Sequence, residues 1–265
     1  MNDSTPSPSA HLSHEIRLIG LRGAPEVTPG MSLANQVIAA AQASEITLQD
    51  GDILVVTQKV VSKAEGLLVD LRAIEPSNLA RRHAERWGKD PRQIEVILRE
   101  SARIVRMDRG LIIAETRHGF VCANAGVDAS NVPGAEMVCL LPDDPDASAA
   151  RLRAELARRL GVELAVIVSD SFGRPWRMGI VNVALGVAGL APLVDYRGQP
   201  DDYGRVMSAS IIAVADEIAA AAELATGKVE RTPFVVVRGY AYQRDAREAG
   251  SGADLIMPAA QDMFR

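Results

Sequence analysis

The sequence has few of the residues that usually mark metal or redox chemistry, with two cysteines and four histidines among 265 residues. Cys122 and Cys139 both lie in apolar, strand-like runs, which predicts buried, reduced thiols rather than a disulfide scaffold. No cysteine and histidine spacing resembles a zinc site. The side chains left for chemistry are therefore carboxylates, amides, hydroxyls and basic groups.

The sequence also lacks the signals of membranes and nucleic acids. No run of about 18 uninterrupted apolar residues occurs, so we expect no transmembrane helix and no membrane partner. Residues 1–14 have neither an apolar centre nor a charged start, which predicts a disordered tail rather than a signal peptide and favours a cytoplasmic protein. The formal net charge of −5 argues against a nucleic-acid partner, since such proteins are broadly basic.

Three common catalytic and nucleotide-binding motifs are missing. The chain contains no GxxxxGK[ST] string and no GxGxxG after a strand, which excludes a P-loop and a dinucleotide fingerprint. It contains no GxSxG nucleophile elbow either. Any nucleotide must therefore be held in another way.

What is present is ordinary globular composition, with 48% apolar and 24% charged residues, and a mixture of helix-like and strand-like segments. The pattern predicts a mixed α/β (α+β) fold with antiparallel portions, as one large domain or two interlocked smaller ones, over residues 15–265. The predicted helices are 32–45, two within 77–100, 144–161 and 208–227, the last being the longest. The predicted strands are 15–21, 52–61, 102–107, 110–116, 119–124, 136–142, 163–170, a pair within 182–198, and 233–239.

Two aspartates stand where apolar strands end. Asp128 follows one strand in the loop "NAGVDASNVPG", and Asp170 is expected at the C-terminal end of strand 163–170. With Ser171 and Asn131 they would form an oxygen-only site, which suits magnesium or manganese with substrate phosphates. The alternative is that each side chain only supports a turn.

Basic side chains accompany both loops. Lys59 and Lys63 follow strand 52–61 and could neutralise a phosphate, or could lie on a solvated turn. Arg174 and Arg177 follow Asp170 in "SDSFGRPWRMG" and could clamp an anion or pair with acidic residues structurally. The residues alone thus indicate an α/β protein that could bind a metal–phosphate ligand.

Six strings, in their order and spacing, make the chain resemble the coenzyme F420-0:L-glutamate ligase family from about residue 15 to 240. The resemblance implies an intertwined two-subdomain fold and a GTP-dependent ligase that adds γ-linked L-glutamate to coenzyme F420-0 through an acyl phosphate. It also implies Mg²⁺ or Mn²⁺, with two ions expected, a K⁺ requirement and a homodimer. The strings are GDILVVTQKVVSKAEG, NAGVDASNVPG, SDSFGRPWRMG, DYRGQPDDYGR, ADEIAAAAELATGK and PFVVVRG.

The resemblance also assigns roles to particular residues. Asp128 and Asp170 match metal carboxylates, Ser171 matches a hydroxyl on a second metal, and Lys63 is expected to act in catalysis as well as in nucleotide binding. The positions that match GTP contacts are Ala24, Pro25, Glu26, Val27, Gln58, Lys59, Lys63 and Asn131.

One residue departs from the family pattern. Archaeal members have an acidic ligand for the second metal where this chain has Lys228. We expect that metal to rely on Asp170, Ser171, phosphate and water and to bind only with nucleotide, the alternative being that Lys228 partly replaces it. Two-domain bacterial members of the family continue into a flavin-binding, reductase-like domain. Because this chain ends at Arg265, we expect the stand-alone form of the ligase. A metal-dependent phosphohydrolase and a non-catalytic nucleotide-binding homologue stay open as other functions.

Overall fold

A five-stranded sheet forms the centre of the protein in the computed structural model, which describes residues 15–242 and 250–263. Only the β2–β8 pair is parallel, and the other neighbouring strands are antiparallel. This mixed sheet confirms the predicted fold class, while the predicted tail at 1–14 lies outside the described residues. The strand order is β1 (Arg17–Leu21), β12 (Phe234–Arg238), β2 (Ile53–Thr57), β8 (Ala165–Arg174) and β9 (Arg177–Ala188).

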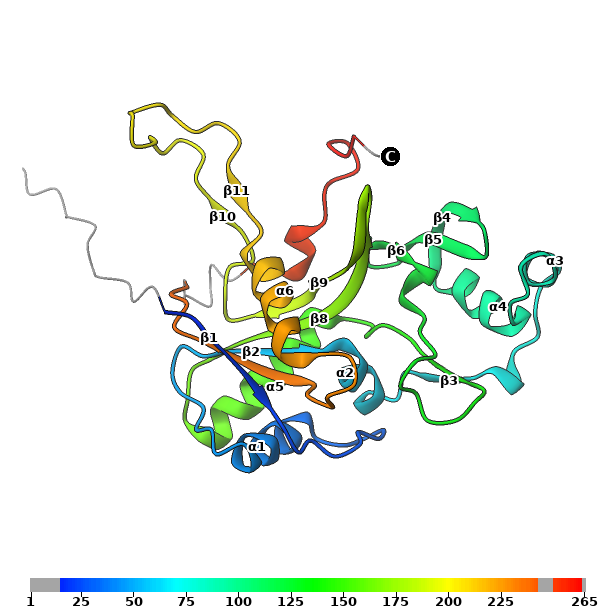
Figure 1. The fold of residues 1–265 in the computed structure, drawn as a ribbon, viewed down its shortest axis with the longest axis horizontal. Coiled ribbons are helices and arrows are strands. Elements are labelled where there is room, and N and C mark those ends of the chain that lie inside the picture. The colour runs from blue at the N-terminus through cyan, green and yellow to red at the C-terminus, as the bar shows by residue number, and fades with distance from the viewer. Residues whose placement is uncertain (1–14, 243–249, 264–265) are drawn as a thin grey trace, which may run out of the picture.

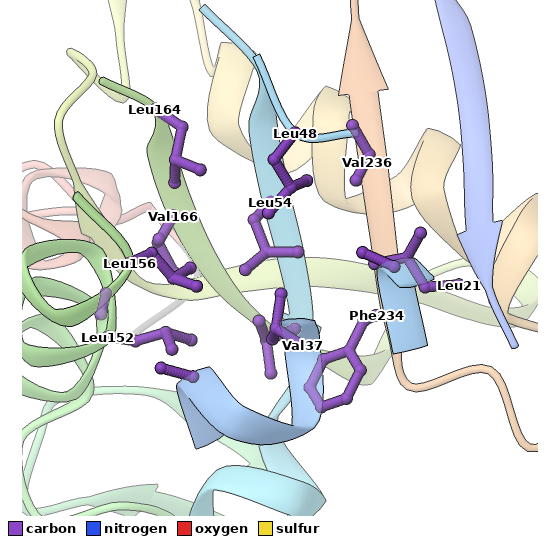
Figure 2. Packing of buried hydrophobic residues seen from close by; sticks show 14 of the residues in the cluster. Leu21, Val37, Leu48, Leu54, Leu152, Leu156, Leu164, Val166, Phe234 and Val236 are labelled. Atoms are coloured by element: carbon purple, nitrogen blue, oxygen red, sulfur yellow. The ribbon is translucent and has the colours of Figure 1, made fainter. Parts of the chain in front are cut away.

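Helices cover both faces of this sheet (Figure 1). Helices α1 (Leu33–Ala43) and α5 (Pro145–Leu160) cover one face, and α6 (Val214–Thr226) covers the other. Because side chains alternate along a strand, Leu54 and Val56 of β2 pack toward α1 and α5, as Figure 2 shows for Leu54. Ile53 and Val55, which alternate with them along the strand, pack toward α6. The continuous apolar run of β2 is therefore explained by burial on both sides.

The helix boundaries follow local sequence signals. The Ser32 hydroxyl caps α1 by accepting a hydrogen bond from the Asn35 backbone N–H, and Asp144 caps α5 in the same way at Ala147. Pro145 occupies the first turn of α5, where its missing N–H costs nothing, and Gly161 ends the helix in a left-handed conformation. These signals confirm the predicted helices at 32–45 and 144–161.

Residues 68–139, within the stretch between β2 and β8, build a second region with its own apolar core. The chain leaves the central sheet near residue 67 and returns near residue 140, so that this region is inserted into the first one, as Figure 1 shows at the right. The three-stranded antiparallel patch and the helix pair broken at "KDP" are confirmed here. Its elements are β3 (Leu68–Asp70), η1 (Leu71–Ala73), α3 (Asn78–Trp87), α4 (Pro91–Arg99), β4 (Ser101–Asp108), β5 (Leu111–Thr116), β6 (Val121–Ala123), η2 (Asn124–Gly126) and β7 (Met137–Cys139).

Two sequence predictions about elements are wrong in detail. The helix predicted at 208–227 begins only at Val214, because 211–212 forms β11 (Ile211–Ile212) against β10 (Val194–Asp195). At 13 residues α6 is shorter than α5, which has 16. The strand pair expected within 182–198 is also absent, since β9 pairs with β8 and β10 pairs with β11.

Among the described residues, no helix is long and apolar enough to cross a membrane. The only 3₁₀ segment of the C-terminal stretch that the structure describes is η3 (Gly252–Leu255).

Candidate active site

A cavity of about 620 Å³ opens at the carboxyl ends of the parallel strands β2 and β8. In the parallel register Thr57, the last residue of β2, lies opposite Ser169, and β8 continues past this point in its hairpin with β9. Asp170 and Ser171 are therefore the first residues beyond the part of β8 that β2 covers. The sequence predicted Asp170 at a strand end. It lies inside a longer strand, but at the expected edge of the sheet, which is where ligands bind in such sheets.

Helix α2 (Gln58–Ala64) supplies two ammonium groups to the cavity. It begins directly after β2, so the strand predicted over 52–61 is too long. Lys59 and Lys63 lie four residues apart and therefore share one face of the helix. They do not lie on a solvated turn, which was the alternative that the sequence left open. The side chain of Lys63 is only 7% exposed and pairs with the carboxylate of Glu26.

Asp128 is fixed by the other lysine. Its carboxylate accepts hydrogen bonds from the Lys59 ammonium, from the Ser130 backbone N–H at 2.7 Å and from the Ser130 hydroxyl at 2.8 Å. Lys59 also donates to the Ser130 carbonyl oxygen at 2.6 Å. Burial alone would raise the pKa of Asp128, but these hydrogen bonds outweigh it and lower that pKa. Asp128 is thus an ionised carboxylate at neutral pH.

Asp170 has a different environment in the same cavity. Burial raises the pKa of Asp170 to about 6, and the nearby charge of Asp128 adds to that increase. The Ser171 backbone N–H and the ammonium groups of Lys59 and Lys228 act in the opposite direction without cancelling it. A half-buried carboxyl group with a raised pKa is a frequent sign of a functional site.

Lys228 fixes the Ser171 hydroxyl. Lys228 donates to the Ser171 hydroxyl at 3.0 Å and pairs with Glu223 of α6 at 3.1 Å. The second carboxylate oxygen of Glu223 accepts from the Asn182 side-chain amide at 2.9 Å. Asn182 lies directly opposite Ser171 in the β8–β9 hairpin.

Two buried oxygen atoms of the cavity wall have no hydrogen-bond partner in the structure, namely Ser169 Oγ and Asn182 Oδ1. Unsatisfied buried oxygens are costly unless something completes them. Both are hard donors of the kind that bind magnesium, potassium or ordered water. The predicted site omitted them. Asn182 lies opposite Ser171 only because the register of the hairpin shifts between Gly173 and Arg174, which the sequence did not indicate.

The remaining residues that were predicted to contact the nucleotide also line the cavity, although the side chain of Gln58 forms hydrogen bonds within the protein. The segment from Ala24 to Val27 forms part of the wall, and Asn131 lies there with a positive φ of 54°. The buried Gln58 instead donates internally, to the Ser62 hydroxyl at 2.6 Å and to the Leu140 carbonyl oxygen at 2.9 Å. Gln58 therefore anchors α2 to the strand that leads back from the second region.

The predicted anion clamp is in the wrong place. Arg174 and Arg177 face each other at the exposed turn of the β8–β9 hairpin, and within the described residues neither one lines the cavity. The sequence placed them near Asp170 because they follow it closely, but an extended strand carries each residue about 3.3 Å further away. Lys228, which the sequence offered as a partial replacement for the second metal, supplies positive charge in the cavity instead, together with Arg231, which the sequence had not singled out.

The donor set fits one hard divalent cation. Among the described residues there is no group of three or more histidine, cysteine, aspartate or glutamate side chains that could hold a metal. Asp128 and Asp170 offer two carboxylates, and magnesium commonly uses one or two carboxylates and completes its shell with phosphate and water. Softer metals are not favoured, since Cys139 is buried outside the cavity lining and burial raises the pKa of the Cys122 thiol to about 12.

Comparison with known proteins identifies the family of the chain. Residues 22–239 match the profile of the family described as F420-0:Gamma-glutamyl ligase. A coenzyme F420:L-glutamate ligase of Methanothermobacter thermautotrophicus is 47% identical over 94% of this chain and 99% of its own length. The corresponding proteins of Methanopyrus kandleri and Methanocaldococcus jannaschii are 46% and 38% identical, over 91% and 95% of this chain and 94% and 97% of their own lengths. The chain therefore belongs to the F420-0:gamma-glutamyl ligase family.

Proposed function

We propose that the protein is a GTP-dependent ligase that joins the amino group of L-glutamate to a carboxylate of coenzyme F420-0 in F420 biosynthesis. The observation that carries the proposal is the cavity itself, where Lys59, Lys63 and Lys228 meet Asp128 and Asp170. Family membership supplies the substrates, because the relatives are named for glutamate ligation to this coenzyme.

The reaction needs activation because a carboxylate has no good leaving group. Transfer of the γ-phosphoryl group of GTP to the F420-0 carboxylate gives an acyl phosphate and GDP. The neutral glutamate amine then attacks the acyl carbon, the C–O bond to phosphate breaks, and the nitrogen loses a proton. The products are an amide, inorganic phosphate and GDP.

The residues of the cavity suit this sequence of steps. Phosphoryl transfer is accelerated mainly by positioning and by charge stabilisation, not by covalent chemistry of the protein. Lys59 and Lys63 place two positive charges on one side of the cavity, and Asn131 is assigned to hold the nucleotide. The walls around them would exclude water, which would otherwise hydrolyse the acyl phosphate.

Asp128 and Asp170 would hold Mg²⁺ or Mn²⁺, which when bound supplies Lewis-acid neutralisation of phosphate charge. Ser169 and Asn182, with their unpartnered oxygens, are the positions we assign to the K⁺ requirement that the resemblance implies. We further propose that the enzyme works in the cytoplasm as a homodimer, and its two cysteines are free thiols, as a reducing compartment favours.

The test is a reconstituted reaction with GTP, Mn²⁺, K⁺, F420-0 and L-glutamate, followed by the masses of the products. We expect F420-0 to gain glutamyl residues while GDP and phosphate form in equal amounts. Omission of glutamate should stop amide formation. Asp170→Asn should slow product formation about a hundredfold, whereas Glu85→Gln, an exposed change on α3, should not.

The other two functions would give different results. Release of phosphate from GTP at the same rate without F420-0 and glutamate would identify a phosphohydrolase. Binding of GTP without any turnover would identify a non-catalytic homologue. Either result would overturn the proposed ligase.

A further inference from the structure

Lysine is scarce in this chain and concentrated in one place. The sequence contains four lysines, and Lys59, Lys63 and Lys228 all line the same cavity, while Lys89 is exposed beyond α3. Lys59 and Lys63 each pair with a carboxylate of the cavity wall, Asp128 and Glu26. Lys228 differs, because it donates to the Ser171 hydroxyl and takes its counter-charge from Glu223, which lies outside the cavity lining.

The backbone fixes where Lys228 lies. It comes directly after Gly227, which ends α6 with a positive φ of 62°. A side chain at Gly227 would overlap the carboxylate of Glu230. That carboxylate accepts a hydrogen bond from the Val229 backbone N–H at 2.9 Å and so orders the loop around Lys228. The helix end and this loop deliver the ammonium group to the cavity at a defined point.

The side-chain contacts then orient the ammonium group. Glu223 holds Lys228 at 3.1 Å and is itself held by the Asn182 amide at 2.9 Å. The ammonium group donates to Ser171 Oγ at 3.0 Å. A neutral hydroxyl that accepts from an ammonium group is a poor metal ligand, because it carries no negative charge to offset the repulsion between the two cations, as a carboxylate does. Hydrogen bonding and charge thus both disfavour a metal on Ser171.

We propose that the ammonium group of Lys228 takes the place of a second metal ion at Ser171, so that the site works with one divalent cation and one fixed lysine charge. This inference rests on the proposed function, since it concerns how the phosphates of GTP are neutralised. It replaces the expectation that a second metal binds at Ser171 together with nucleotide. A lysine brings one positive charge and three donors to phosphate oxygens and needs no free metal.

The first experiment counts bound Mn²⁺ by electron paramagnetic resonance at saturating non-hydrolysable GTP analogue. The wild-type chain should bind one ion per chain. Lys228→Glu supplies a carboxylate beside Ser171 and should bind two. Lys89→Glu makes the same charge change far from the cavity and should bind one. Two ions on the wild-type chain, or one on Lys228→Glu with its circular dichroism unchanged, would overturn the proposal.

The second experiment removes the charge without adding a ligand. Lys228→Met should weaken binding of the GTP analogue about tenfold in EDTA, because a charged hydrogen-bond donor to phosphate is lost. Lys89→Met should bind as the wild type does. An unchanged affinity in Lys228→Met would contradict the proposal.

The two experiments also separate this proposal from the proposed function. A wild-type chain that makes the glutamyl product but binds two Mn²⁺ ions would overturn only the proposal that Lys228 takes the place of a metal ion. A chain that binds no GTP analogue under any condition would overturn both.

Discussion

Asp128 and Asp170 line the same cavity, but their surroundings shift their pKa values in opposite directions. Lys59 and Ser130 donate hydrogen bonds that hold Asp128 in its ionised form, whereas burial raises the pKa of Asp170 to about 6. Protonation is therefore easier at Asp170 as the pH falls. A cation that bound both carboxylates would relieve the unfavourable burial of Asp170 more than that of Asp128.

Removal of either carboxylate charge should affect turnover much more than folding. Asp128→Asn and Asp170→Asn should each reduce kcat on the order of a hundredfold, because each removes charge that neutralises the transition state. Neither side chain belongs to an apolar core cluster, so thermal unfolding should change little. Steady-state kinetics at saturating Mn²⁺ provide the measurement. Near-normal turnover in either variant would refute the two-aspartate site.

Lys63 should act mainly on the nucleotide. Its buried ammonium group lies on the cavity side of α2 beside Glu26, so Lys63→Ala should raise the KM for GTP by about tenfold or more. The KM for glutamate should change much less. Lys89→Ala serves as the control. Equal increases in both KM values would instead indicate a structural lysine.

At the scale of elements, the close approach of α5 to β9 depends on Gly186. A Cβ at this position would overlap the Pro145 carbonyl group and come within 2.7 Å of the Asp146 backbone nitrogen. The α5 backbone cannot move away easily, because Asp146 also accepts hydrogen bonds from the backbone N–H groups of Val187 and Gly252 at 2.7 and 2.8 Å.

Gly186→Ala should therefore lower the free energy of unfolding by about 2–3 kcal/mol. Urea denaturation followed by circular dichroism would measure the shift in midpoint at constant slope. Gly173→Ala is the matched control, since nothing lies within 4 Å of its added Cβ and its stability should match that of the wild type. Equal stability of the two variants would show that the sheet and α5 can separate at no cost.

Helix α6 is docked on β9 by a carboxyl group whose charge is disfavoured. Asp216 accepts a hydrogen bond from the Ala184 backbone N–H at 2.8 Å. Burial raises the pKa of Asp216 above its ordinary value of 3.8, and this outweighs the hydrogen bond. The position in the first helical turn favours the charge, but burial still has the larger effect.

This shift predicts how stability depends on pH. The folded state binds the Asp216 proton more tightly than the unfolded state does. The stabilisation of the folded state that results from this difference is therefore complete below pH 3.8. It is lost as the pH rises from there through the raised pKa. Asp216→Asn keeps an acceptor and stays neutral, so its stability relative to the wild type should increase with pH. Urea denaturation across this range would test the trend, and a constant difference between the proteins would contradict it.

At the scale of the whole molecule, two hairpins project from the sheet layers (Figure 1). The β8–β9 and β10–β11 hairpins carry large apolar side chains in contact with solvent, among them Met178 and Tyr203 at 97% and 91% exposure. Exposed apolar groups that gather on projecting elements often mark an interface. These hairpins are where we expect the proposed homodimer to form.

Light scattering during gel filtration should give twice the 28.3 kDa of one chain. Met178→Glu should shift the mass toward the monomer, because it introduces a charge into the expected interface. Leu79→Glu, on an exposed site of α3, should leave the dimer intact. A wild-type mass of one chain at micromolar concentration would contradict the homodimer.

The sequence by itself determined the features that depend on neighbouring residues. Ser32, Asp144 and Gly161 mark helix ends because capping is local. The apolar run of β2 predicted a strand buried on both faces, and the six strings predicted the family. Lys59, Lys63, Asp128 and Asp170 were all identified in advance as residues of one site, and they line one cavity.

The tertiary structure decided which distant residues meet. Lys228 reaches Ser171 only because α6 packs on the sheet and ends beside β8, a contact between residues 57 positions apart. Asn182 lies opposite Ser171 because of the hairpin register, and Arg174 is carried away from the cavity by the same strand. Local sequence records propensity and the order of residues. Register and packing depend on burial summed over the whole core, so the charges around the cavity emerge only when the chain folds.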